Sequence, residues 1–177
     1  MNHEVGAELE GPHAGVPPLM AGTPLELVVL VKGFAHWLTV QASDTVAAAW
    51  QALQANRRMY LRVFRHAGAD RPWLLAIHGY RMGHNWMDFG LFPPEVLHQK
   101  LGYNLLLPTL PLHGSRKVGR KSGDQYLDGD LLDLVHAQTQ ALWDLRSALA
   151  WLRDREVAPK IGVYGVSLGG FNAALLA

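Results

Sequence analysis

The segment that most restricts the fold is residues 160–177, which read KIGVYGVSLGGFNAALLA. A short apolar run ends in the pattern Gly165-Val-Ser167-Leu-Gly169, and a second apolar run follows it. The first run predicts a strand and the second a helix, so Ser167 would lie on a tight turn between them. Such a turn crowds the positions two residues to either side of the serine. This crowding explains why both positions, Gly165 and Gly169, are glycine. The pattern indicates a strand–turn–helix unit that lifts one serine hydroxyl out of a sheet.

Ser167 is therefore a candidate catalytic nucleophile. A serine hydroxyl attacks poorly until a base takes its proton and nearby donors stabilise the oxyanion that forms. The turn would point the backbone N–H of Leu168 toward the reacting oxygen, at the positive end of the new helix. This chemistry implies no cofactor and no metal.

The rest of the chain alternates between helix and strand signals. Ser43 or Asp44 could cap a helix, and leucines at helical spacing predict a long helix that Pro159 prevents from continuing. Strands alternating with helices indicate an α/β protein with a mostly parallel sheet and helices on both faces. The expected helices are 43–58, 92–102 and 130–154, and the expected strands are 59–67, 73–79, 103–110 and 161–166.

Composition limits the classes of partner. The 177 residues are 49% hydrophobic and 18% charged, with a net charge of +1 and no cysteine. A nearly neutral chain gives no electrostatic case for nucleic acid, and the absence of cysteine excludes disulfides and thiolate metal sites. Residues 1–24, rich in Gly and Pro, are expected to form a loose N-terminal arm, and residues 25–177 to form part of a single domain.

Residues 23–40, TPLELVVLVKGFAHWLTV, are the most apolar segment of the N-terminal half. Lys32, Gly33 and His36 interrupt this segment, which falls short of the roughly 20 apolar residues that a membrane span needs. The segment is interpreted either as a buried element or as one that contacts a membrane surface. Stable membrane insertion is not expected. Because residues 1–22 lack the basic start of a signal peptide, the expected location is cytoplasmic.

The motifs taken together resemble the α/β-hydrolase superfamily over about residues 58–177. WLLAIHGY looks like the strand that carries the family's His-Gly oxyanion-hole signature, with His78 and Gly79 as the pair. The resemblance implies that Tyr80 supplies a second oxyanion N–H beside Leu168. It also implies that Ser167 attacks a small-molecule ester, or alternatively an amide as in a peptidase-like acyl hydrolase, and forms an acyl-enzyme.

The chain departs from that superfamily after the serine. The family order is Ser, then Asp or Glu, then His, but no acid and no histidine follows Ser167 here. The expectation is an α/β-hydrolase-like domain that is incomplete at its C-terminus and inactive by itself. A C-terminal segment beyond Ala177 would then supply the acid and the histidine. The alternatives are a split hydrolase completed by a partner chain and a non-catalytic scaffold that binds a partner.

Other candidate groups have simpler interpretations. His84 would lie in a loop over the site, His113 in a structural loop and His136 in the long helix, packed or solvated. Residues 85–92, NWMDFGLF, are expected to form an apolar loop that serves either for packing or as one wall of an acyl pocket. The basic run 116–121, RKVGRK, is expected to be a solvated loop. The upstream acids are assigned to a loop and a helix N-terminus; they are Asp124, Asp128, Asp130 and Asp133.

Overall fold

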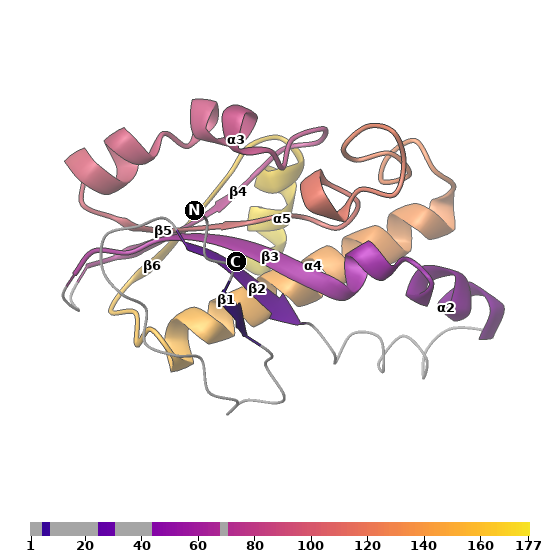
Figure 1. Cartoon of the computed structure of the whole chain (residues 1–177), viewed down its shortest axis with the longest axis horizontal. Helices are drawn as coiled ribbons and strands as arrows, with labels where there is room; N and C mark the ends of the chain where they lie inside the picture. The colour runs from indigo at the N-terminus through magenta and orange to yellow at the C-terminus, as the bar shows by residue number, and fades with distance from the viewer. Residues whose placement is uncertain (1–4, 8–24, 31–43, 68–70) are drawn as a thin grey trace.

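The computed structural model describes residues 5–7, 25–30, 44–67 and 71–177. Their strands form one six-stranded sheet in the order β1-β2-β3-β5-β4-β6 (Figure 1). Three pairings are parallel, namely β1–β2, β4–β5 and β4–β6. Strand β3 is antiparallel to both of its neighbours, β2 and β5. The strands are β1 (Val5–Ala7), β2 (Leu25–Leu30), β3 (Arg58–Phe64), β4 (Trp73–Ile77), β5 (Asn104–Pro108) and β6 (Ile161–Gly165).

Helical segments connect these strands. The helices are α2 (Asp44–Gln51), α3 (Asn85–Leu91), α4 (Leu131–Asp154) and α5 (Leu168–Leu176), with a π-helical segment η3 (Glu95–Lys100) and two short 3₁₀ turns, η2 (Gln54–Arg57) and η4 (Gly114–Arg116). The expected long helix is confirmed as α4. Its N-cap is Asp130, whose carboxylate accepts a hydrogen bond from the Asp133 N–H at 2.8 Å, while the Asp133 carboxylate accepts one from the Asp130 N–H. This reciprocal capping box fixes where α4 begins.

Two expectations about local structure are corrected. Residues 85–91, expected as a loop, form helix α3, and Asp88 within it is buried. The helix expected over 43–58 ends at Gln51 and is followed by the separate turn η2.

The expected N-terminal arm is described only in part. Val5–Ala7 within residues 1–24 forms strand β1, which pairs with β2. The other residues of the expected arm lie outside the described residues. Of the apolar segment 23–40, residues 25–30 form strand β2 and the remainder lies outside the description. Over the residues that the structure describes, no helix combines the length and apolarity that a bilayer crossing requires.

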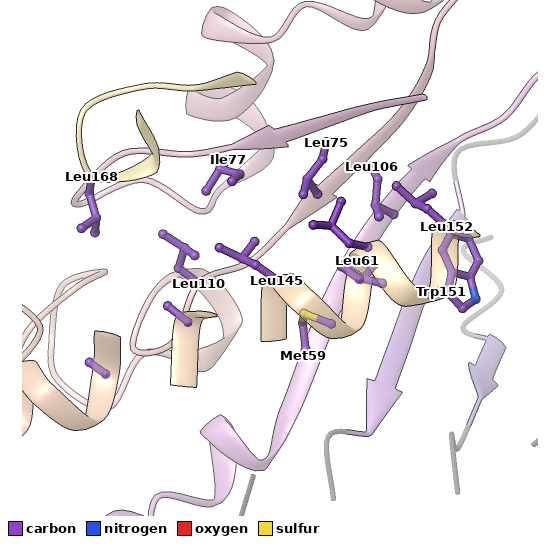
Figure 2. Packing of buried hydrophobic residues seen from close by; sticks show 14 of the residues in the cluster. Met59, Leu61, Leu75, Ile77, Leu106, Leu110, Leu145, Trp151, Leu152 and Leu168 are labelled. Atoms are coloured by element: carbon purple, nitrogen blue, oxygen red, sulfur yellow. The ribbon is translucent and has the colours of Figure 1, made fainter. Parts of the chain in front are cut away.

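Apolar side chains pack on both faces of the sheet. On one face, Leu61, Leu75 and Ile77 pack with Leu145 and other residues of α4 (Figure 2). On the other face, Ala76, Leu105 and Leu107 form a second cluster with Phe92, against which residues of α3 and η3 pack. Since side chains alternate along a strand, neighbouring residues of β4 and β5 serve opposite layers. The expected α/β class with helices on both faces is confirmed (Figure 1).

The basic run 116–121 is only partly a solvated loop, because Arg116 is fully buried. Its guanidinium donates to the Asp144 carboxylate of α4 at 2.7 Å, to the Thr109 carbonyl at 2.9 Å and to the Asn56 carbonyl at 3.0 Å. This ion pair joins the η4 turn to the middle of α4. Arg116, the first residue of the basic run, therefore connects two elements inside the protein.

Replacing Arg116 with methionine is expected to destabilise the fold by about 3–5 kcal/mol, because it leaves the Asp144 carboxylate buried without its cation. The double variant Arg116→Met with Asp144→Leu should recover most of this loss, since it removes both charges. Urea unfolding followed by tryptophan fluorescence measures the difference. Lys117→Met, at the exposed neighbouring position, is the matched control and should change the free energy of unfolding by less than about 0.5 kcal/mol. Equal stabilities for the Arg116 variant and the control would contradict this account.

Candidate active site

Ser167 lies on the sharp turn between β6 and α5 that its sequence predicts. Its backbone has φ 54° and ψ −117°, a left-handed conformation that L-residues rarely adopt. The side chain is exposed, and among the described residues its hydroxyl has no hydrogen-bond partner. Strain of this kind persists only where the surrounding structure enforces it, and it gathers at functional sites.

Two glycines make this turn possible. A Cβ at Gly169 would lie closer than 3.0 Å to the Ile77 and His78 carbonyl oxygens, and a Cβ at Gly165 would lie equally close to the Gly169 carbonyl. All of these atoms belong to the backbone, which cannot move aside as a side chain can. The crowding that the motif predicts at both glycines is therefore present.

The loop after β4 lies directly beside the serine. The Val166 N–H donates to the Ile77 carbonyl at 3.2 Å, which joins the two chain segments at the base of the turn. A Cβ at Gly79 would lie 3.5 Å from the Ser167 Cβ and 3.1 Å from the Val166 carbonyl oxygen. The His-Gly segment and the serine turn, 88 positions apart in sequence (167 − 79), thus form one site.

Tyr80 and Leu168 directly follow Gly79 and Ser167 in the sequence and carry the two candidate backbone donors. Leu168 is the first residue of α5, where the N–H groups of a helix have no partner within it. Within the described part of the chain, the N–H groups of Tyr80 and Leu168 have no hydrogen-bond acceptor. The Leu168 side chain packs into the main apolar cluster and anchors the start of α5 (Figure 2).

His78 supports the loop rather than facing substrate. It is buried, its Nδ1 contacts the Gly79 carbonyl at 2.8 Å, and its Nε2 accepts a hydrogen bond from the Leu110 N–H at 3.0 Å. This pattern requires a neutral ring with the proton on Nδ1. Burial lowers the pKa of His78 to about 3, so the ring stays neutral at physiological pH.

His113 lies behind the loop and packs against the rings of His78, Tyr80 and Tyr126. It is fully buried, and its Nδ1 contacts the Pro111 carbonyl at 2.8 Å. Burial lowers its pKa to about 3. The structural placement expected for this residue agrees with these contacts.

The other expected groups lie elsewhere. His84 is the residue before α3 and is partly buried. The His136 ring stacks on Trp50 at 5.5 Å, which agrees with a packed position in the long helix. Over the described residues, no cluster of three His, Asp or Glu side chains could hold a metal ion.

The side chains that hold the loop after β4 were not among the expected site residues. Arg81 forms ion pairs with Asp124 and Asp128, and the buried Asp88 pairs with Arg62 and accepts a hydrogen bond from the Gly83 N–H at 3.0 Å. No local pattern identifies such partners, because they are far apart in sequence.

His113 makes a pH-dependent contribution to stability. Its folded pKa of about 3 lies below the ordinary value of 6.5, so the unfolded chain binds the extra proton first as the pH falls. The stabilisation is complete above about pH 6.5 and is lost progressively toward pH 3. Between pH 7 and pH 5 the loss should be about 2 kcal/mol.

The variant His113→Asn retains a donor to the Pro111 carbonyl but does not titrate. We expect the stability difference between the wild-type protein and this variant to shrink by about 2 kcal/mol from pH 7 to pH 5. Urea unfolding at each pH measures it, and the subtraction removes the contributions of all other titrating groups. A difference that stays constant over this range would contradict the burial of a neutral ring.

No family model matches the chain. The uncharacterized proteins MT2702 and Rv2627c, from two strains of Mycobacterium tuberculosis, are each 42% identical over 128 residues, which is 72% of this chain and 31% of theirs. The chain therefore spans less than a third of the length of these curated relatives.

Three solved structures share part of the fold. TT1662 from Thermus thermophilus has a TM-score of 0.49 and 24% identity, covering 67% of this chain and 46% of its own. An alpha-beta serine hydrolase homologue from Coxiella burnetii has a TM-score of 0.43 and 18% sequence identity. The match covers 68% of this chain and 51% of that protein. A predicted CIB-like hydrolase from Thermoplasma acidophilum has a TM-score of 0.41 and 25% sequence identity. The match covers 67% of this chain and 49% of that protein.

Proposed function

We propose that the chain carries the nucleophile and oxyanion site of a serine hydrolase that cleaves carboxylic esters. The observation that supports this most is the Ser167 backbone, held at φ 54° with its hydroxyl exposed beside the loop after β4. A tight strand-to-helix turn of this kind presents a serine nucleophile at the top of a sheet.

The proposed reaction follows from the groups around the serine. Ser167 Oγ forms a bond to the ester carbonyl carbon while its proton passes to a general base. The Tyr80 and Leu168 N–H groups then donate to the oxyanion, and its collapse breaks the bond to the alcohol, which leaves with the proton. Water, deprotonated by the same base, hydrolyses the acyl-enzyme and regenerates the serine. No step requires a cofactor.

The general base in this proposal is a histidine, paired with an Asp or Glu, from outside the described residues. His78 cannot serve, because both of its ring nitrogens are engaged with the backbone. His113 is fully buried behind the loop. The base would come from a further segment of a longer protein or from a partner chain. The greater length of the curated relatives supports the first source.

The edge of the sheet supports the same proposal. Strand β6 is the last in the sheet order. Val163 and Tyr164 of β6 and Phe171 and Leu175 of α5 are exposed. A sheet edge with unpaired backbone groups and apolar neighbours is a surface that proteins normally cover. A segment that continues the sheet beyond β6 would cover it and could bring an acid and a histidine to Ser167.

The test is hydrolysis of p-nitrophenyl acetate and butyrate by a longer protein that includes this chain, and by residues 1–177 alone. We expect a rapid first release of p-nitrophenol followed by slower turnover in the longer protein, and almost none in residues 1–177. Activity regained when a separate complementing chain is added would indicate a split enzyme. Faster cleavage of p-nitroanilides would indicate a peptidase-like acyl hydrolase, and no activity in any form would favour a scaffold.

The lack of cysteine agrees with a reducing, cytoplasmic location for such an enzyme.

A further inference from the structure

The loop after β4 turns sharply at residues 79–83, the segment that we call the oxyanion turn. The Met82 N–H donates to the Gly79 carbonyl at 3.3 Å, which places Tyr80 and Arg81 at the centre of the turn. Arg81 has φ 68°, in the left-handed region that favours glycine. A non-glycine residue in this conformation requires contacts that hold it there.

The guanidinium of Arg81 makes such contacts. It forms ion pairs with Asp124 and, at 2.8 Å, with Asp128, and it donates to the Ser122 carbonyl at 3.2 Å. It also lies over the Tyr80 ring, 4.7 Å from the ring centre. One side chain thus ties the centre of the oxyanion turn to the loop that precedes α4.

The two carboxylates are themselves held by backbone groups. Asp124 accepts a hydrogen bond from the Lys121 N–H at 2.9 Å, and Asp128 accepts one from the Gln125 N–H at 2.7 Å. The Lys121 N–H, together with Arg81, holds the pKa of the Asp124 carboxyl below its usual range. Arg81 therefore meets acceptors whose positions are fixed.

The C-terminal end of the oxyanion turn is fixed separately. The Ser122 hydroxyl donates to the Met82 carbonyl and accepts from the Gly114 N–H at 2.9 Å. The Gly83 N–H donates to Asp88. The Tyr80 N–H belongs to the peptide between Gly79 and Tyr80, whose Gly79 carbonyl is held by the His78 ring and by the Met82 N–H. The backbone conformation of Arg81 sets the direction of that Met82 N–H.

We propose that Arg81, held by Asp124 and Asp128, is a positioning residue that orients the Tyr80 N–H toward the oxyanion. This inference rests on the proposed function, because it assigns the turn a role in the reaction at Ser167. In this reaction the Arg81 side chain contacts no reacting atom. It acts through the turn, whose hydrogen bond from the Met82 N–H to the Gly79 carbonyl orients the peptide that carries the Tyr80 N–H. Its loss should therefore lower turnover more than substrate binding.

The decisive variant is Arg81→Gly in the longer protein. Glycine adopts φ 68° without strain, so a role limited to backbone shape would leave turnover unchanged or raise it. We expect instead that kcat for p-nitrophenyl acetate falls by about 10- to 100-fold, with KM within about threefold of the wild-type value. Arg81→Lys, which keeps one ion pair, should recover part of the loss. Arg120→Gly, an exposed arginine in the 116–121 loop, is the matched control and should leave both constants unchanged.

Wild-type kcat in Arg81→Gly, or a loss equal to that of Arg120→Gly, would overturn the proposal. Amide hydrogen exchange over residues 79–83 tests whether the Arg81 contacts hold the oxyanion turn, independently of catalysis. We expect faster exchange in Arg81→Gly than in Arg120→Gly. If the wild-type protein neither hydrolyses esters nor reacts with a fluorophosphonate, the proposed function fails and the assigned role in the reaction falls with it. Unchanged exchange in an active enzyme would overturn the positioning role alone.

Discussion

Ser167→Ala is expected to lower ester turnover by about 10⁴- to 10⁶-fold in a protein that completes the site, a range taken from the loss of the nucleophile or base in serine proteases. The reason is that the acyl-enzyme cannot form without Oγ. Any remaining rate would come from the oxyanion donors and from substrate binding. Stopped-flow release of p-nitrophenol should show no burst.

Ser167→Gly separates chemistry from folding at the same position. Glycine adopts φ 54° without the strain that serine bears there. This variant should therefore be inactive yet more stable than the wild-type protein, by about 1 kcal/mol. A variant both inactive and less stable would indicate that the backbone at 167 is not held in a strained conformation. Turnover above about one tenth of the wild-type rate in Ser167→Ala would exclude the serine as nucleophile.

Gly169→Ala, which adds a single methyl group, should strongly destabilise this fold. The new Cβ would lie closer than 3.0 Å to the Ile77 and His78 carbonyl oxygens. The end of β4 and the start of α5 would have to move apart, which would separate the serine from the oxyanion turn. We expect a loss of more than about 3 kcal/mol in the free energy of unfolding, or failure to fold. Thermal unfolding by circular dichroism measures the change.

Gly90→Ala is the matched control for added volume. Nothing lies within 4 Å of a Cβ at Gly90, which sits in helix α3. Alanine favours helix more than glycine does, so this variant should be unchanged or more stable by up to about 1 kcal/mol. If both glycine variants behaved alike, the crowding at Gly169 could not be what shapes the serine turn.

Sequence periodicity predicted the elements that carry strong local signals. The leucine spacing placed α4 to within a residue of its observed start. The glycines at 165 and 169 predicted the serine turn, because few other arrangements of strand and helix require two such small residues. These features depend on neighbours within a few positions, which a single sequence displays directly.

Features that depend on distant residues were not predictable in this way. Arg116 stands in a basic run that is typical of a solvated loop, yet its partner Asp144 is 28 positions away on α4. Arg81 and Asp124 are 43 positions apart, so no spacing rule connects them. Helix α3 lies where a loop was expected, and Gly90 weakens the helical pattern of this segment. Its stability comes instead from packing on the sheet and from the buried pair of Asp88 with Arg62.

Covalent labelling tests most directly whether Ser167 is an activated nucleophile. A longer protein that includes this chain would be treated with a fluorophosphonate, digested and analysed by mass spectrometry. We predict one stoichiometric adduct on the peptide containing Ser167, absent after prior heat denaturation and absent in Ser167→Ala. Labelling of a different serine, or no labelling of a folded protein that hydrolyses esters, would contradict the claim.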